Sequence, residues 1–113
     1  MRKQDKKTDN QLRAVLTNVC DAALNTCDGF LWLTHVVNYA NFPDSLKIVC
    51  VFETNAQLAN FTSGTHQAQL NTLIQNQLGS MGIRLKSIAR HVIYDSEENC
   101  DRQHQGNWAK RLQ

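Results

Sequence analysis

Four acidic residues lie at the ends of predicted strands, and one histidine lies inside a predicted strand. Such groups can perform acid–base chemistry. A carboxylate and an imidazole in contact can act as a general acid–base pair. His35 lies inside an apolar run, and Glu53 follows the next one. Their spacing does not require contact, because a histidine in a strand is equally explained by one hydrogen bond within a sheet. We therefore predict no catalytic residue and keep a weak acid–base enzyme as a third hypothesis; the acids considered are Glu53, Asp95, Glu97 and Glu98.

Cys100 and His104 are the residues best spaced to bind a metal. They are four apart, so a helix would place them on one face. Two ligands do not complete a tetrahedral zinc site, and a polar helix face explains the same residues. The chain also has no phosphate loop, nucleophile elbow or dinucleotide-binding glycine pattern. His91, Asp95 and Glu98 are possible further ligands beside Cys100 and His104. We nevertheless predict no metal and no cofactor.

Basic residues form clusters, although the net charge is only +2. Clusters of this kind usually form solvated faces, yet they can also bind the phosphates of nucleic acids. An RNA- or ribosome-associated domain is therefore the second hypothesis. The residues assigned to it are Lys6, Lys7, Arg84, Lys86 and Arg90.

The composition favours one cytoplasmic domain. The 113 residues are 42% hydrophobic and 19% charged, which is typical of a globular domain with one core. We expect no membrane span and no secretory signal, because no apolar stretch reaches about 20 residues and the N-terminus is polar. The four cysteines match no metal or disulfide pattern and are expected to be free thiols.

Hydrophobic periodicity predicts the first helix. Behind Thr8, apolar residues recur at intervals of three and four and form one stripe. Thr8 and Gln11 stand at the spacing of a capping box, so we expect the helix to begin there. Residues 1–7 are then expected to form a disordered basic tail. Gly29, which can adopt a left-handed conformation, is expected to end the helix.

A β-hairpin is the strongest local pattern. Residues 30–39 are rich in aromatic and β-branched side chains, and residues 45–52 form the return strand. Pro43 and Asp44 favour a turn between them. The return strand is apolar on both faces, which predicts that it is central in its sheet.

The second half of the chain predicts two helices and a third strand. Thr54 and Gln57 repeat the capping-box spacing before a short helix, and residues 62–65 separate it from a longer one. Residues 83–95 return to strand character. Ser96, with two acids behind it, resembles a helix start.

These elements predict an α+β fold in the order α-β-β-α-α-β, with a polar, helical C-terminal appendage at residues 96–113. One three-stranded sheet with helices mainly on one face would bury the apolar stripes of a single domain, residues 1–113. The order is similar to that of type II KH domains, and that similarity implies binding of single-stranded RNA through a GxxG loop. The corresponding residues 62–65, Thr-Ser-Gly-Thr, have one glycine and no basic neighbour.

An exposed aromatic surface is the leading functional hypothesis. If helices cover only one sheet face, the other is left for a protein partner or for a second copy. The alternative is that the C-terminal tail folds back to cover it. We therefore expect a non-enzymatic interaction module that acts through the sheet face or the hairpin, with Phe30, Trp32, Thr34 and Trp108 as the binding residues.

The segments WLTH, FPDSLKIVCVF, DSEENC and GNWAKRL resemble a group of small bacterial proteins of unknown function, some of them labelled Fis-type transcriptional regulators. The label implies a helix-turn-helix with a basic recognition helix. The chain matches only Gly106, Asn107, Ala109 and Leu112 of that pattern, and no recognition helix follows them. We therefore expect no reading of the DNA major groove.

Overall fold

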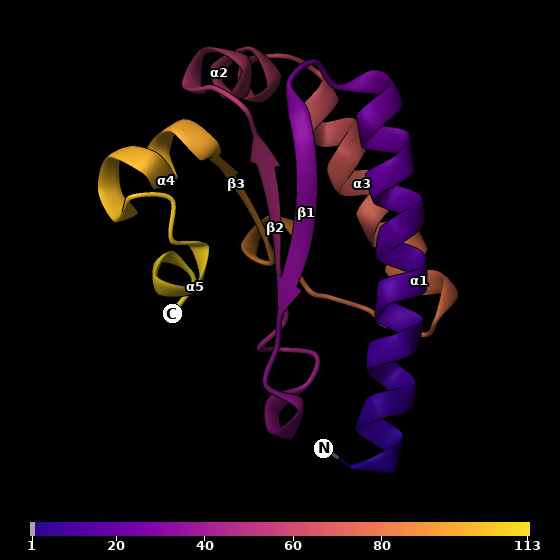
Figure 1. Cartoon of the computed structure of the whole chain (residues 1–113). Helices are drawn as coiled ribbons and strands as arrows, with labels where there is room; N and C mark the ends of the chain where they lie inside the picture. Colours follow the sequence, from indigo (N-terminus) through magenta and orange to yellow (C-terminus); the bar gives the residue numbers. More distant parts are fainter. Residues whose placement is uncertain (1) are drawn as a thin grey trace.

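Three strands form one sheet between two layers of helices (Figure 1). A computed structural model describes residues 2–113. The predicted α+β class and the predicted order α-β-β-α-α-β are confirmed. In chain order the elements are α1 (Lys3–Thr26), β1 (Phe30–Val36), the 3-10 helix η1 (Tyr39–Asn41), β2 (Lys47–Phe52), α2 (Asn55–Ser63), α3 (His66–Ser80), the 3-10 helix η2 (Ile88–Arg90), β3 (Val92–Ser96), α4 (Glu97–His104) and α5 (Trp108–Arg111).

The sheet is mixed, with the strand order β1-β2-β3. β1 and β2 form the predicted hairpin and pair antiparallel, whereas β2 and β3 pair parallel. Parallel neighbours need a long crossover, and α2 and α3 provide it. β2 is central as predicted, because all residues from Ile48 to Phe52 are buried.

The main core lies between the sheet and the two long helices. α1 and α3 pack on one face of the sheet, and α4 and α5 lie on the opposite side (Figure 1). The core face of β2 contributes Ile48, Cys50 and Phe52. The helices contribute Leu12, Leu16, Val19, Ala23, Leu70, Ile74 and Leu78. None of the helices described between residues 2 and 113 is long and apolar enough to cross a membrane.

α1 begins at Lys3, five residues before the predicted capping box. Residues 3–7 are thus helical rather than a disordered tail, and Met1 lies outside the described residues. Thr8 caps nothing: its hydroxyl donates to the carbonyl of Gln4, 3.1 Å away, within the helix. The physical reason is that extending a formed helix is inexpensive, and lysine and glutamine are good helix formers.

A bulge in β1 corrects the predicted face of Phe30. Phe30 pairs with Phe52 and Trp32 pairs with Val51, so β1 holds one extra residue, Leu31, at this point. An extra residue moves the side chains before it to the other face. Phe30 is therefore buried in the main core, where its ring meets that of Phe52 edge-on at 5.7 Å.

The third strand is shorter than predicted. Only Val92–Ser96 pairs with β2, whereas residues 83–91 form an irregular segment that contains η2. In the parallel register Val92 pairs with Ile48, and β2 begins at Lys47, so the residues before Val92 lie beyond the start of the strand that they would have to join. Those residues instead connect the end of α3 to the start of β3.

The capping box at α2 is confirmed, and it predicts a stability change. The Thr54 hydroxyl accepts from the Gln57 N–H at 3.2 Å, and the Gln57 side chain accepts from the Thr54 N–H at 3.3 Å. We expect Thr54→Ala to lower the free energy of unfolding by about 1 kcal/mol in urea titrations. Thr72→Ala, exposed on α3, is the control and should change it by less than about 0.5 kcal/mol. Equal effects would contradict a capping role.

Candidate functional site

The second face of the sheet is covered by the C-terminal segment of the chain itself. The rings of Trp32 and Trp108 meet edge-on, with centroids 4.9 Å apart. Both indole N–H groups donate to Glu97, at 2.8 Å from Trp32 and 3.0 Å from Trp108. Glu97 is therefore an acceptor that holds strand and tail together rather than a free acid for catalysis.

A second contact fastens the same segment to β3. The Arg111 guanidinium donates to both oxygens of Asp95, at 2.6 and 3.0 Å, and both side chains are largely buried. Burial alone raises the pKa of Asp95, but the hydrogen bonds from Arg111 and from the Ser96 N–H outweigh it, so that pKa lies below its ordinary value. We call the contacts among Trp32, Asp95, Glu97, Trp108 and Arg111 the C-terminal latch.

The C-terminal latch covers much of the surface that was predicted to bind a partner. Phe30 belongs to the main core, while Trp32, Thr34 and Trp108 are only partly exposed. The structure therefore agrees with the alternative prediction, in which the C-terminal tail folds back over the second face of the sheet. Sequence reasoning missed Arg111 as the residue that anchors the tail, because its partner Asp95 is 16 residues away.

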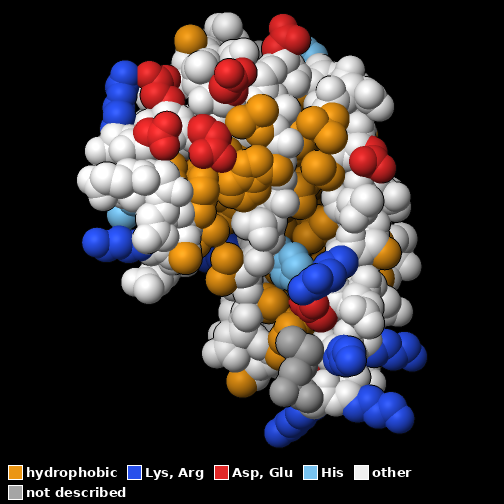
Figure 2. Space-filling view, in the orientation of Figure 1, with side chains coloured by type: hydrophobic (Ala, Val, Ile, Leu, Met, Phe, Trp, Pro, Cys, Tyr) orange, Lys and Arg blue, Asp and Glu red, His pale blue; other side chains and the backbone are white. Residues whose placement is uncertain are grey.

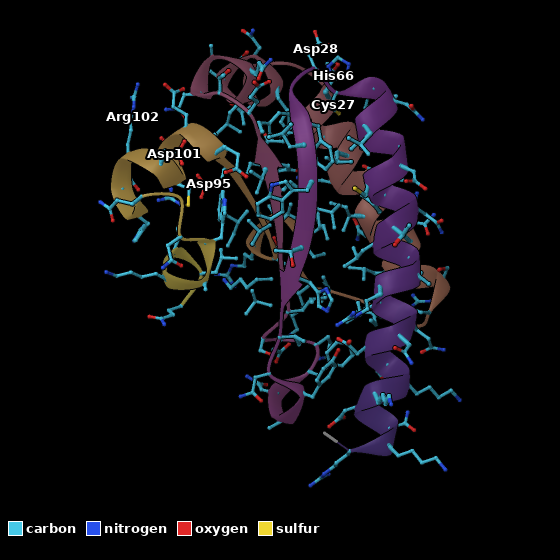
Figure 3. The ribbon with its side chains drawn as sticks, in the orientation of Figure 1. Cys27, Asp28, His66, Asp95, Asp101 and Arg102 are labelled. Carbon is cyan, nitrogen blue, oxygen red and sulfur yellow. The ribbon has the colours of Figure 1, made fainter. Side chains whose placement is uncertain are left out.

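The two residues spaced for a metal do not form a site. Cys100 is fully buried, and His104 Nδ1 accepts from Arg111 Nη1 at 3.2 Å. Among residues 2–113, no three His, Cys, Asp or Glu side chains are placed to hold a metal ion. Glu98, an acid on α4, accepts a hydrogen bond from Arg102 at 2.7 Å, and Arg102 points away from the sheet (Figure 3).

Cys27, Asp28 and His66 lie near one another where α1 ends and α3 begins (Figure 3). Cys27 and His66 border a cavity of about 410 Å³. His66 is exposed, and the Cys27 thiol contacts the Thr26 hydroxyl at 3.6 Å. No hydrogen bond joins Cys27 to His66 among the contacts of residues 2–113.

The residues assigned to RNA binding are not gathered at the α2–α3 loop. Lys6 and Lys7 lie in the first turns of α1, at the opposite end of the molecule from α2 (Figure 1). Arg84 and Lys86 lie in the irregular segment after α3, and Arg90 ends η2. The contact that a KH-type loop would need with basic residues is therefore not formed.

A groove of about 810 Å³ lies between α1 and the free edge of β1. One wall is the side of α1, and the other consists of consecutive β1 residues and those just after them. Figure 2 shows apolar side chains gathered along this side of the molecule. The lining includes Arg13, Leu16, Thr17, Cys20 and Asp21 from α1 and residues 33–37 from the strand side.

Asp9 joins the two walls at one end of the groove. One carboxylate oxygen accepts from the Tyr39 hydroxyl at 2.6 Å and from His35 Nε2 at 3.1 Å, and the other accepts from Arg13 Nε at 2.9 Å. A carboxylate can only accept, so Nε2 of His35 carries the proton. The hydrogen bonds from Tyr39 and His35 lower the pKa of Asp9 to about 2. Burial, followed by the hydrogen bond to Asp9, raises the pKa of Tyr39 above its ordinary value.

Sequence reasoning singled out His35 as a residue inside a strand but did not find Asp9. That residue lies 26 positions before His35. Only the crossing point of α1 over β1 brings them together. The hydrogen bonds of Asp9 join α1 to β1 and to the segment after it at this end of the groove.

Comparison with known proteins does not assign the chain to a family. The chain matches no family model, no curated protein and no solved structure. The groove along β1 is an open surface that brings together residues of α1 and of an edge strand.

The latch predicts a fluorescence change. Trp32 and Trp108 are the only two tryptophans, so tryptophan emission reports on this contact. We expect Arg111→Ala to shift the emission to longer wavelength, to raise quenching by acrylamide and to lower the free energy of unfolding by about 2 kcal/mol, since it leaves Asp95 without its charged donor. Lys110→Ala, on the exposed side of the same turn, should leave all three unchanged. An unaltered emission spectrum in Arg111→Ala would show that the latch is not closed in solution.

The Asp9 cluster predicts acid sensitivity. The pKa of Asp9 falls from 3.8 to about 2 on folding, so its contribution to stability is present above pH 3.8 and is lost as the pH falls through about 2. In urea titrations from about pH 5 down to about pH 2, Asp9→Asn should be less stable at the upper end and should lose less stability on acidification. Asp44→Asn, in the exposed hairpin loop, should keep the wild-type dependence. Parallel curves for wild type and Asp9→Asn would contradict the assignment.

Proposed function

We propose that this protein is an interaction module that binds an extended segment of a protein as a fourth strand at the edge of β1. The observation that carries the proposal is the groove, which places an open wall of α1 along a strand that pairs on one side only. Main-chain hydrogen bonds to such an edge supply affinity, and side-chain pockets beside it supply specificity.

The free edge of β1 supports strand addition. In an antiparallel pair, alternate residues direct their N–H and C=O groups away from the partner strand. β1 pairs with β2 alone, so these groups face the groove. Proteins usually protect an edge of this kind with charge, proline or a covering element. β1 carries no Lys, Arg, Asp, Glu or Pro between Phe30 and Val36.

Apolar side chains beside the edge support the same function. Cys20 of α1 and Leu33 of β1, both partly exposed, line the groove, and they offer contacts to alternate side chains of an added strand. Leu31 and Val36 of β1 are themselves exposed by 38% and 41%. The other edge strand, β3, carries a charged residue, Asp95, which is bonded to Arg111 of the C-terminal latch.

Peptide selection tests the proposal. Peptides of about 12 residues, long enough to pair along one strand, would be selected on the wild-type protein from a random display library and measured by fluorescence anisotropy. We expect Val36→Lys to weaken binding by about 10-fold or more, because a lysine on an edge strand opposes pairing. Ile93→Lys on β3, where the isoleucine is also 41% exposed, is the matched control and should bind normally.

Two results would contradict the proposal. One is that no peptide is enriched, and the other is that both lysine variants bind equally well. The RNA alternative is measured with the same proteins. Binding to a mixed RNA pool that falls steeply with salt, survives Val36→Lys and is lost when Lys6, Lys7, Arg84 and Lys86 are neutralised would favour that alternative.

A further inference from the structure

We infer that the strand received at the β1 edge is β1 of a second copy of this chain, paired antiparallel about a two-fold axis. The inference rests on the proposed function, because it names the partner of the same groove. The result is a continuous six-stranded sheet in which the two α1 helices run antiparallel beside the seam. Three observations favour this partner: the charge order along α1, the position of the exposed apolar side chains, and the composition of β1.

The charge of α1 changes sign along its length. From Arg2 to Arg13 the chain carries five basic and two acidic residues, and from residue 14 to residue 28 it carries two acidic residues, Asp21 and Asp28, and no Lys or Arg. Figure 2 shows basic side chains near the N-terminal end of α1, whereas the acidic ones at the top of the view gather mainly over α4 and α2. The side of α1 that bears the groove is thus basic towards its N-terminal end, and its few charges are acidic towards the other end.

An antiparallel two-fold contact uses this polarity. A two-fold axis pairs each surface with itself in the reverse direction, so the basic half of one α1 lies beside the acidic half of the other. The two helix dipoles then also run in opposite directions, which is the favourable arrangement for neighbouring helices. Parallel pairing of the two edges would place basic halves together and acidic halves together, and like charges side by side oppose association.

Exposed apolar side chains lie along the same seam. Among residues 2–113, four large apolar side chains are exposed, and three of them are Leu24, Leu31 and Val36. Leu31 and Val36 lie on β1. Leu24 follows Thr17, which lines the groove, by seven residues, so helical periodicity places it on the same side of α1. A two-fold axis doubles this set and buries it in one interface.

β1 also has the composition of the strand that the groove would accept. It is an uncharged segment of aromatic, aliphatic and β-branched residues with strong strand preference, and it is already held extended by β2. A pre-formed strand loses less conformational entropy on binding than a flexible peptide does. A second copy therefore offers the β1 edge a complementary charge order, apolar side chains and a strand that is already extended.

Sedimentation equilibrium of the full chain tests the inference. At chain concentrations from about 1 to about 200 μM, a range that spans a micromolar Kd, we expect the mean mass of the wild type to rise towards twice the mass of the chain. Val36→Lys should be monomeric over this range, and Ile93→Lys should remain a dimer. Circular dichroism of each variant, which reports on its helices and strands, confirms that it is folded.

Charge reversal tests the antiparallel arrangement. Arg2→Glu combined with Lys6→Glu makes both halves of the α1 pair acidic, and Asp21→Lys combined with Asp28→Lys makes both basic. Each double variant alone should dimerise at least about 10-fold more weakly than the wild type at low salt, because like charges then meet at both ends of the seam. An equimolar mixture of the two should recover the wild-type dimer as a heterodimer.

The outcomes separate the two proposals. A wild type that stays monomeric at about 200 μM, well above a micromolar Kd, or a dimer that persists in Val36→Lys, overturns the second-copy inference. If that monomer still binds selected peptides in a manner lost on Val36→Lys, the proposed function stands with a different partner. If it neither dimerises nor binds peptides, both fail.

Discussion

Burial of β2 on both faces is the constraint on which the rest of the structure depends. Five consecutive residues, from Ile48 to Phe52, are inaccessible, so the chain must supply a cover on each side. Burying such side chains contributes about 1.5–3 kcal/mol each. α1 and α3 cover one face with a broad apolar layer. The short C-terminal helices cover the other, where Trp108 packs against Trp32 of β1 and Arg111 forms an ion pair with Asp95 of β3.

Covering both faces leaves the edges of the sheet as the accessible main chain. β3 carries the charged residue Asp95, which Arg111 binds. At β1, Asp9 bonds His35 and Tyr39 and so holds α1 against one end of the strand, and a groove lies beside it. The carboxylate that joins α1 to this end of β1 thus also lines the proposed binding surface.

Local patterns were predicted well where a few neighbouring residues suffice. The capping box at Thr54 and Gln57 is formed by contacts three residues apart, and Ser96 likewise accepts from the Asn99 N–H at 3.0 Å. The prediction for Thr8 was wrong because a capping pattern is also compatible with a helix interior, where Thr8 bonds Gln4. The predicted face of Phe30 was wrong because strict alternation of side chains fails at a bulge. Nothing in the sequence near Leu31 indicates that a bulge occurs there.

The amino-acid sequence by itself determined the class of fold, the hairpin and the central position of β2, because periodicity and apolar runs state which surfaces must be buried. The tertiary structure decided which side chains meet: Asp9 with His35 across 26 residues, and Trp32 with Glu97 across 65. Such contacts depend on where a helix crosses a strand and on where the tail returns. Both are properties of the whole packing, so the groove and the latch became visible only when the chain was folded.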